Sequence, residues 1–388
     1  MRKSLFTTLA VAATLAAGTA TAQTQGVTKT EITIGSIQDL SGPIAGYGKQ
    51  TRMGMQLRVD EINEQGGING RKLKILFEDS GYDPKRAVLA AQKLVNQDKI
   101  FAMLGHLGTA QNNAAMPIQF EKNVINFFPL SAAREMFDPV HRLKFAYAGP
   151  YFDQVRVMLP KLVKEKSAKK VCAFYQDDEF GLEVLRGAEA GLKAMNMELV
   201  EKTSYKRGAT DYSSQVARMK ASGCDLVVMG TIIRETIGAI AEGRKTGFTP
   251  TFLGTSASYT DLIHKLGGPA INGFYTAMAA QNPYTDDPSQ PVRFWATKFK
   301  TKFGEDPATF SAYGYYIVDS FAKALSKAGG NLTTDTFVKA MDNMTIPPDI
   351  FGFPEMTFSA TKRLGSYAAR LSQIQDGRWK VVSEYVTP

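Results

Sequence analysis

Histidine and cysteine, the side chains that most often bind metals or act as nucleophiles, are scarce in this chain. It has three histidines and two cysteines among 388 residues. The histidines are too far apart to form a recognised metal-binding pattern; they are His106, His141 and His264. The sequence also lacks a G-x-S-x-G elbow, a Walker phosphate loop and a G-x-G-x-x-G turn after a predicted strand. We therefore expect a binding protein and not an enzyme, with no metal or other cofactor.

Long apolar runs are absent after the first 22 residues, so no later segment is expected to span a membrane, which takes about 20 apolar residues. Residues 1–22 have the three parts of a secretory signal: basic Arg2 and Lys3, an apolar stretch from Leu5 to Ala17, and Ala20-Thr21-Ala22 before Gln23. The apolar stretch is too short for a membrane anchor. We predict cleavage after Ala22 and export to the periplasm as a soluble protein.

Charge of one sign is not concentrated in any region. The chain has 46 basic and 37 acidic residues and a net charge of +9, but the two signs are interleaved along its length. Such a pattern is typical of a solvated surface, and we expect no nucleic-acid partner.

The two cysteines, Cys172 and Cys224, lie at the beginnings of predicted neighbouring strands and could pair in an oxidising compartment. A chain of this size does not need a disulfide framework, and we expect two buried thiols instead.

Strands and helices alternate in two series along the chain. The first runs from Ile32 to Phe127 and the second from Val171 to Gly254, with a connector at Tyr147 to Tyr151. This alternation predicts the α/β class, with two doubly wound parallel-sheet lobes. Helices and a predicted hairpin at Asp376-Gly377 follow the second series, and we expect them to complete the two lobes.

Ligands of such sheets bind at the carboxyl ends of the strands, where loops lead into helix N-termini. Six polar or glycine-rich loops meet this description: 39–48, 105–112, 129–134, 176–181, 230–235 and 254–259. In the second loop Thr109 and Ala110 stand where a helix should begin, which favours a carboxylate. Tyr47 and Phe180 could cover an apolar part of a ligand, and Arg234 is the cation best placed to meet an anion.

Several stretches match a known family over almost the whole chain after the signal. They are Asp60-Glu61-Ile62-Asn63, the segment 66–73, Asp83-Pro84, Asp39-Leu40-Ser41-Gly42-Pro43 and Gly105-His106-Leu107. The sequence resembles the periplasmic Leu/Ile/Val-binding proteins, the type I solute-binding components of branched-chain amino-acid-type ABC importers. The resemblance implies the type I periplasmic binding protein fold, with three hinge crossovers near Tyr147, Thr276 and Phe353. The N-terminal lobe is then residues 26–147 and 277–352, and the C-terminal lobe residues 148–276 and 353–388.

The resemblance also implies the binding residues. The family's carboxylate-binding hydroxyl falls on Thr109, and the next loop falls on Ser131 and Ala132. Tyr47 matches an aromatic pocket wall, and Phe180 replaces the family's tyrosine. We also place Ile232, from the loop 230–235, in the pocket.

Two departures concern the ligand. Ala132 stands where amino-acid binders of the family have a threonine beside the ammonium, and Ser256 where they have an acid. A buried ammonium without an anionic partner costs several kcal/mol. We therefore expect an aromatic or aliphatic organic acid, with branched-chain amino acids as the alternative ligand.

The resemblance implies a monomer that delivers its ligand to an inner-membrane ABC permease. A receptor that senses a ligand for a membrane signalling partner is the alternative, because the same clamp serves both roles.

Overall fold

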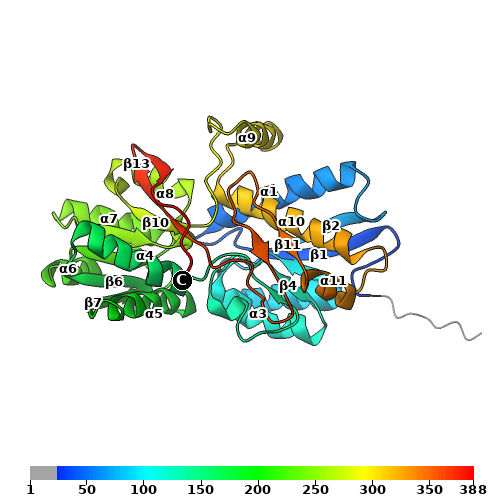
Figure 1. Cartoon of the computed structure of the whole chain (residues 1–388), viewed down its shortest axis with the longest axis horizontal. Coiled ribbons are helices and arrows are strands. Elements are labelled where there is room, and N and C mark those ends of the chain that lie inside the picture. Colours follow the sequence, from blue (N-terminus) through cyan, green and yellow to red (C-terminus); the bar gives the residue numbers. More distant parts are fainter. Residues whose placement is uncertain (1–23) are drawn as a thin grey trace, which may run out of the picture.

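The computed structural model describes residues 24–388. The predicted signal segment, residues 1–22, lies outside the described residues. Among the helices of residues 24–388, none combines the length and hydropathy that a membrane span requires. Two sheets, one parallel and one mostly parallel, each have helices on both faces and form two lobes that lie side by side (Figure 1).

The N-terminal lobe contains a five-stranded parallel sheet in the order β2-β1-β3-β4-β5. Its strands are β1 (Glu31–Gln38), β2 (Lys72–Asp79), β3 (Ala102–Leu104), β4 (Ile125–Phe127) and β5 (Lys144–Phe145). Its helices are α1 (Ala45–Glu64), α2 (Pro84–Gln92), α3 (Thr109–Glu121), α9 (Gln290–Phe303), α10 (Thr309–Ala328) and α11 (Thr334–Met341). Helices α1 and α10 pack together above the sheet, and α2 packs against α3.

The contact between α1 and α10 depends on two glycines. A Cβ on Gly54 of α1 would lie 1.9 Å from the Ser311 carbonyl oxygen, and one on Gly314 of α10 would lie 2.2 Å from that of Thr51. Because neither glycine has a side chain, the two helix backbones touch. This contact fixes α10, which carries part of the cavity wall described below.

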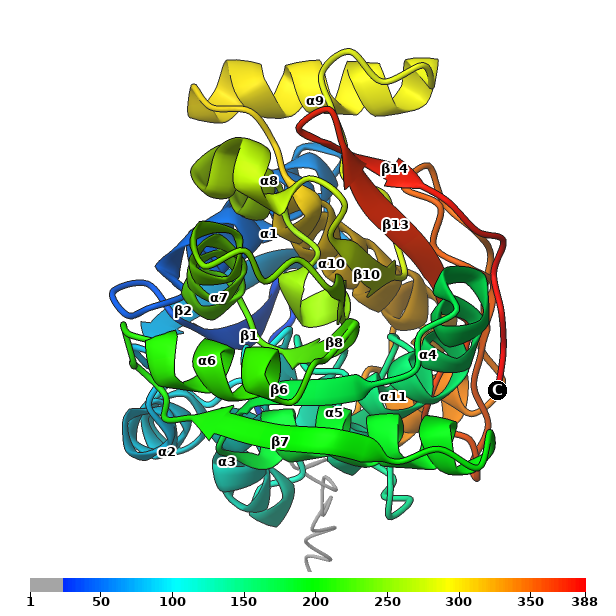
Figure 2. The same ribbon diagram turned by 90° about the vertical axis from the view of Figure 1, so that its left-hand side faces the viewer.

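The C-terminal lobe contains a seven-stranded sheet in the order β14-β13-β10-β9-β8-β6-β7, in which β13 and β14 are antiparallel to their neighbours. Its strands are β6 (Val171–Gln176), β7 (Leu199–Tyr205), β8 (Leu226–Gly230), β9 (Thr251–Gly254), β10 (Tyr275–Met278), β13 (Arg370–Gln375) and β14 (Arg378–Val381). Its helices are α4 (Tyr151–Lys166), α5 (Glu179–Lys193), α6 (Ser213–Ala221), α7 (Arg234–Lys245) and α8 (Asp261–Gly267). Helices α4 and α5 cover one face, with α6 and α7 on the other (Figure 2).

Short elements complete the chain. A two-stranded sheet pairs β11 (Thr345–Ile346) with β12 (Met356–Thr357). A π-helical turn extends α2, and three 3-10 turns lie in loops; these are η1 (Lys93–Gln97), η2 (Arg134–Met136), η3 (Ser256–Ser258) and η4 (Gly268–Ile271).

The predicted α/β class and both series of strands and helices are confirmed. Asp83 caps α2 by accepting a hydrogen bond from the Arg86 N–H at 2.9 Å, and Pro84 follows at the first helical position. The predicted hairpin at Asp376-Gly377 joins β13 to β14, with positive φ at both residues.

We predicted the second and third crossovers between the lobes near Thr276 and Phe353. In the structure both crossovers lie at later residues. Thr276 lies inside β10 of the C-terminal lobe, so that crossover follows Met278. Residues 353–366 stay with the N-terminal lobe, where Leu364 bridges to Ala146. The return to the C-terminal sheet is near Tyr367, because the apolar side chains of residues 353–364 complete the N-terminal core.

The crossovers lie close together. Gly149, in the first, packs against the third so closely that a Cβ would lie 2.8 Å from the Tyr367 carbonyl oxygen. The Tyr385 hydroxyl donates to the carbonyl of Ala279, beside the second crossover, at 2.6 Å, and it also reaches the Gly352 carbonyl. The C-terminus therefore lies between the two lobes (Figure 1).

Cys172 and Cys224 form a disulfide, so the expectation of two free thiols is wrong. Cys172 lies in β6 and Cys224 just before β8, and these strands are neighbours in the sheet. The pairing brings the two Cα atoms within 5.9 Å, which a disulfide can bridge.

We expect a double variant, Cys172→Ala with Cys224→Ala, to lose about 2–4 kcal/mol of unfolding free energy, because the disulfide restricts the unfolded chain. Urea denaturation of the two proteins measures the difference. Dithiothreitol should destabilise the wild type but not the variant. Equal stability of wild type and variant would show that the disulfide does not contribute.

Candidate functional site

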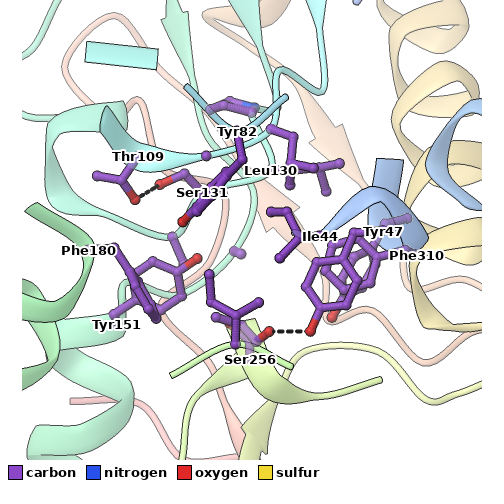
Figure 3. Close-up of a pocket in the computed structure, with 18 of the residues that line it drawn as sticks. Ile44, Tyr47, Tyr82, Thr109, Leu130, Ser131, Tyr151, Phe180, Ser256 and Phe310 are labelled. Carbon is purple, nitrogen blue, oxygen red and sulfur yellow. Dashed lines mark hydrogen bonds between the residues drawn. The ribbon is translucent and has the colours of Figure 1, made fainter. Parts of the chain in front are cut away.

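A cavity lies between the lobes, bounded by loops at the carboxyl ends of strands in both sheets (Figure 3). Of the described residues that line it, none carries a formal charge at pH 7. Its wall is mostly aromatic and aliphatic. These properties are typical of a site for a small, largely apolar molecule that a few hydrogen bonds orient.

Two hydroxyls at the N-terminal-lobe side of the cavity form its main polar group. Thr109 begins α3 and Ser131 follows β4, and their side-chain oxygens are 2.8 Å apart. No side chain caps α3, and the N–H groups of Thr109 and Ala110 have no acceptor among the described residues. A helix N-terminus with free N–H groups favours a carboxylate, and the hydroxyl that accepts within the pair keeps its own proton to donate.

The loop before α3 is held from behind by Asn112. Its side-chain amide donates to the carbonyl oxygens of His106 and Gly108, both at 2.7 Å. Gly108 has a φ of 102°, which favours glycine, and it lets the chain turn into the helix. Burial lowers the pKa of His106 to about 3, so this imidazole is neutral and adds no positive charge beside Thr109.

Aromatic rings form most of the remaining wall. Tyr47 stacks on Phe310 of α10 with ring centroids 3.8 Å apart, and Tyr151 packs edge-on against Phe180 at 5.0 Å. Burial and interactions with other tyrosines raise the pKa of Tyr147 well above its usual range, so its hydroxyl stays protonated. The rings offer broad apolar faces with hydroxyl donors at their edges.

Ser256 contributes the polar group on the C-terminal-lobe side. Its N–H donates to the side-chain oxygen of Gln154 at 2.9 Å, and its hydroxyl accepts from the Gln154 side-chain nitrogen at 2.9 Å. Gln154 lies on α4, one turn after Tyr151. Ser256 and Ala132 both line the cavity, and neither supplies a negative charge.

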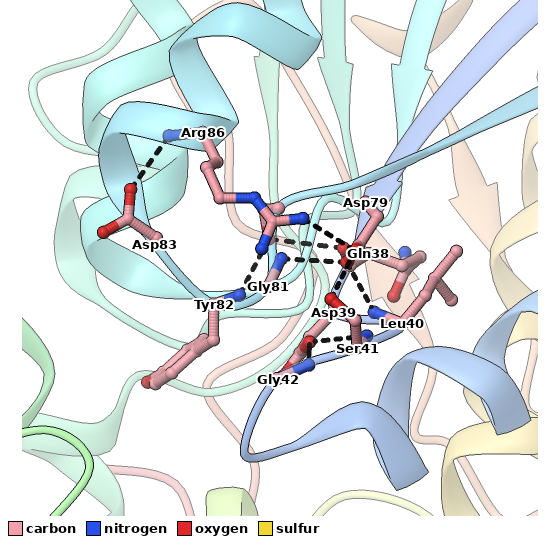
Figure 4. Close-up of polar contacts among 11 residues, drawn as sticks. Gln38, Asp39, Leu40, Ser41, Gly42, Asp79, Gly81, Tyr82, Asp83 and Arg86 are labelled. Carbon is pink, nitrogen blue, oxygen red and sulfur yellow. Dashed lines mark hydrogen bonds and ion pairs between the residues drawn. The ribbon is translucent and has the colours of Figure 1, made fainter.

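A network of carboxylates shapes the loops that carry Ile44, Tyr47 and Tyr82 (Figure 4). Asp39 accepts hydrogen bonds from the N–H groups of Gly42 and Ile44. Asp79 accepts from Leu40 and Gly81, both at 2.8 Å. The loop between β1 and α1 is therefore tied to the end of β2.

Asp79 stays ionised because of these bonds. Partial burial raises its pKa, but hydrogen bonds from Ser41, Leu40 and Gly81, together with the nearby charge of Arg86, lower it to about 2.

Comparison with known proteins identifies the family. Residues 31–378 match the model of a family described as periplasmic binding protein. The chain belongs to the periplasmic binding protein family. It is a substrate-binding protein of the ABC-transporter type with the type I fold, as the resemblance in its motifs implied.

Two relatives in sequence are informative. The chain is 28% identical to an amino acid binding protein of Pseudomonas aeruginosa, over 78% of this chain and 80% of the relative. It is 27% identical to the Leu/Ile/Val-binding protein of Escherichia coli, over 66% of this chain and 71% of the relative.

Solved structures show the same fold. A fatty acid ABC transporter substrate-binding protein from Thermomonospora curvata has a TM-score of 0.84 at 21% identity, covering 94% of this chain and 95% of that one. A branched-chain amino acid transporter substrate-binding protein from Streptococcus pneumoniae, in complex with isoleucine, has a TM-score of 0.78 at 21% identity, covering 92% and 100%.

In this member of the family, most of the predicted binding residues meet at one cavity. Those that line it are Tyr47, Thr109, Ser131, Ala132, Phe180, Ile232 and Ser256. Ala110 is buried in α3 behind Thr109 and does not line it. Arg234 begins α7 with its side chain exposed to solvent, so the structure does not place this cation at the cavity.

The sequence interpretation missed several aromatic wall residues, namely Tyr82, Tyr147, Tyr151, Phe310 and Tyr313. Tyr147 and Tyr151 lie at the two ends of the segment that we treated only as a connector. A connector that leads into a helix beside the cleft can itself line the cavity. The two tyrosines of this connector were the sequence feature that could have predicted it.

Direct contacts join the two lobes around the cavity, so the structure is a closed form. The Tyr47 hydroxyl donates to the Ala257 carbonyl at 2.7 Å. Outside the cavity, Arg134 of the N-terminal lobe donates to both carboxylate oxygens of Glu183 on α5, at 2.8 to 3.1 Å. Glu183 is 1% exposed, and Arg134 is 38% exposed.

We expect the ligand to stabilise this closed form, so its addition should lower the radius of gyration in small-angle scattering. Glu183→Gln should weaken ligand binding about fivefold, because the lost pair costs about 1 kcal/mol after allowance for the exposure of Arg134. Calorimetry measures this change.

Glu201→Gln is the matched control, because Glu201 pairs with Arg218 within the C-terminal lobe. This variant should bind as the wild type does. A scattering curve that ligand does not change would contradict the clamp mechanism.

Proposed function

We propose that this protein captures a small organic acid in the periplasm and delivers it to an inner-membrane ABC permease. The observation that carries the proposal is the pairing of the Thr109 and Ser131 hydroxyls at the uncapped N-terminus of α3. That arrangement can hold a carboxylate with hydroxyl and backbone donors and with the favourable end of the helix dipole. The aromatic wall can then cover the apolar part of the solute.

The absence of a partner for an ammonium group favours an acid over an amino acid. Ala132 has no polar side-chain atom, and Ser256 has a hydroxyl that is already bonded to Gln154. An amino acid would lose the hydration of its ammonium in the closed cleft, and no anion lining the cavity offsets that cost.

Branched-chain amino acids are a second candidate ligand, because the relative from Escherichia coli is named a Leu/Ile/Val-binding protein. The two candidates share the carboxylate and differ in the ammonium. The first experiment below therefore tests the binding of the carboxylate, and the second tests the effect of the ammonium.

We expect Thr109→Ala to weaken binding of the solute by about 1.5–3 kcal/mol, the range for a hydrogen bond to a charged group. Isothermal titration calorimetry measures the loss. Thr333→Ala is the control: Thr333 caps α11 by accepting from Thr336, far from the cavity, so this variant should keep its affinity. Unchanged affinity of the Thr109 variant would place the carboxylate elsewhere.

We expect 4-methylpentanoate to bind at least about tenfold more tightly than leucine, because it has the same carbon skeleton without the ammonium, whose burial costs several kcal/mol. Ser256→Glu should narrow or reverse this preference by supplying the missing negative charge. Calorimetry with both solutes on both proteins gives the comparison. Tighter binding of leucine by the wild type would contradict the organic-acid proposal.

A further inference from the structure

The direction of the hydrogen bonds around Ser256 is fixed by two backbone groups. The Ser256 N–H can only donate, so the Gln154 side-chain atom that it meets is the oxygen. The Gly149 carbonyl can only accept, so the atom that meets it, at 2.6 Å, is the Gln154 nitrogen. The two hydrogen bonds therefore require the same orientation of the Gln154 side-chain amide.

This orientation determines what the Ser256 hydroxyl can do. The Gln154 nitrogen donates to the Ser256 oxygen at 2.9 Å, so that oxygen is an acceptor within the protein. The Ser256 hydroxyl proton has no acceptor among the described residues, although the side chain lines the cavity. Ser256 thus presents a hydrogen-bond donor to a ligand.

Besides Ser256, tyrosine hydroxyls of the cavity wall also have protons without an acceptor among the described residues. Tyr147 and Tyr313 line the cavity, are buried, and donate to no acceptor in the described part of the chain. Tyr82 accepts a hydrogen bond from Gln176 at 3.3 Å, which leaves its proton free as well. A buried donor without an acceptor is unfavourable, so a matching ligand brings acceptors.

Ser256 lines the same cavity as the hydroxyl pair of Thr109 and Ser131, so one molecule in that cavity can meet both polar groups. Tyr151 contacts Ser131 with its hydroxyl, and Gln154 holds Ser256. Tyr151 and Gln154 are three residues apart on α4, and Cβ atoms at this spacing lie about 5–6 Å apart. The first turn of α4 therefore carries both a wall residue, Tyr151, and the side chain that holds Ser256.

We propose that Gln154 acts as a positioning residue that makes Ser256 a donor, and that the solute is a 2-oxo acid, whose oxo group accepts from Ser256. This inference rests on the proposed binding of a carboxylate at Thr109 and Ser131. An oxo oxygen has two lone pairs and no proton, so it satisfies donors without adding one. An ammonium has three donors and no acceptor, so it matches this wall poorly.

The test compares acids that differ only in the oxo group. The pairs are 4-methyl-2-oxopentanoate with 4-methylpentanoate, and phenylpyruvate with 3-phenylpropanoate. For whichever pair binds, calorimetry at pH 7 should show the oxo acid binding about tenfold more tightly than the acid without the oxo group. A tenfold difference is the upper range for one hydrogen bond. Ser256→Ala should reduce the difference to about twofold or less, because the donor is lost.

Ser258→Ala is the matched control, since its hydroxyl donates to the Thr255 carbonyl at 3.1 Å and does not line the cavity. This variant should keep the full preference for the oxo acid.

Gln154→Glu tests the positioning role. A carboxylate at this position can only accept, so the Ser256 hydroxyl would donate to it and turn its lone pairs toward the cavity. The preference for the oxo acid should disappear, and leucine should gain affinity relative to the wild type. Circular dichroism checks that this variant folds; if it does not, Ser256→Ala decides alone.

The outcomes separate the two proposals. Equal affinity of the wild type for both members of a pair that binds would overturn the 2-oxo acid inference and leave the capture of a carboxylate standing. Retention of the preference by Ser256→Ala would overturn the assigned role of Ser256. Failure of both pairs to bind would overturn both proposals.

Discussion

A closed cleft removes its contents from water, and each polar group inside must then find its partner within the cleft. In this protein the cavity wall carries hydroxyl and N–H donors but no charged side chain. The paired hydroxyls of Thr109 and Ser131, the neutral His106 behind them and the Ser256 hydroxyl all fit that condition. The proposed selection of the solute therefore depends on the balance of donors and acceptors and not on an ion pair.

The polar groups of the cavity come from elements that are distant in the sequence. Loops after parallel strands bring Thr109, Ser131 and Ser256 to the edges of two sheets that face each other. Helix α10 adds Phe310 and Tyr313, and the backbone contact at Gly54 and Gly314 holds that helix against α1. Backbone packing directly behind the aromatic wall thus determines where Phe310 and Tyr313 stand.

Much of the fold and part of the site could be predicted from the sequence. The β-branched strands, the Asp83-Pro84 helix start and the Asp376-Gly377 hairpin depend on local periodicity and turn chemistry, and all three appear in the structure. Thr109 could be placed because a loop after a parallel strand reaches the ligand side of the sheet, and Ser131 through the family resemblance. The disulfide could not be decided, because strand adjacency permits a pairing of Cys172 with Cys224 without requiring it.

Contacts between side chains that lie far apart in the sequence could not be predicted from local sequence patterns. Gln154 lies in the first turn of an ordinary amphipathic helix, and its bonds to Gly149 and Ser256 exist only in the folded protein. Arg234 misled the prediction because the first turn of α7 turns this residue toward solvent. The third crossover was misplaced because the apolar residues from Phe353 to Leu364 fit either core by composition alone.

The close approach of Gly149 to Tyr367, with Tyr385 beside the second crossover, bears on the energetics of selection. If crossovers packed side by side bend about one shared axis, closing the lobes is the same rotation whichever molecule fills the cleft. The free energy of that rotation is then a constant offset in every measured affinity. A substitution at the hinge would shift all solutes by the same factor, whereas one at Ser256 would change their rank order.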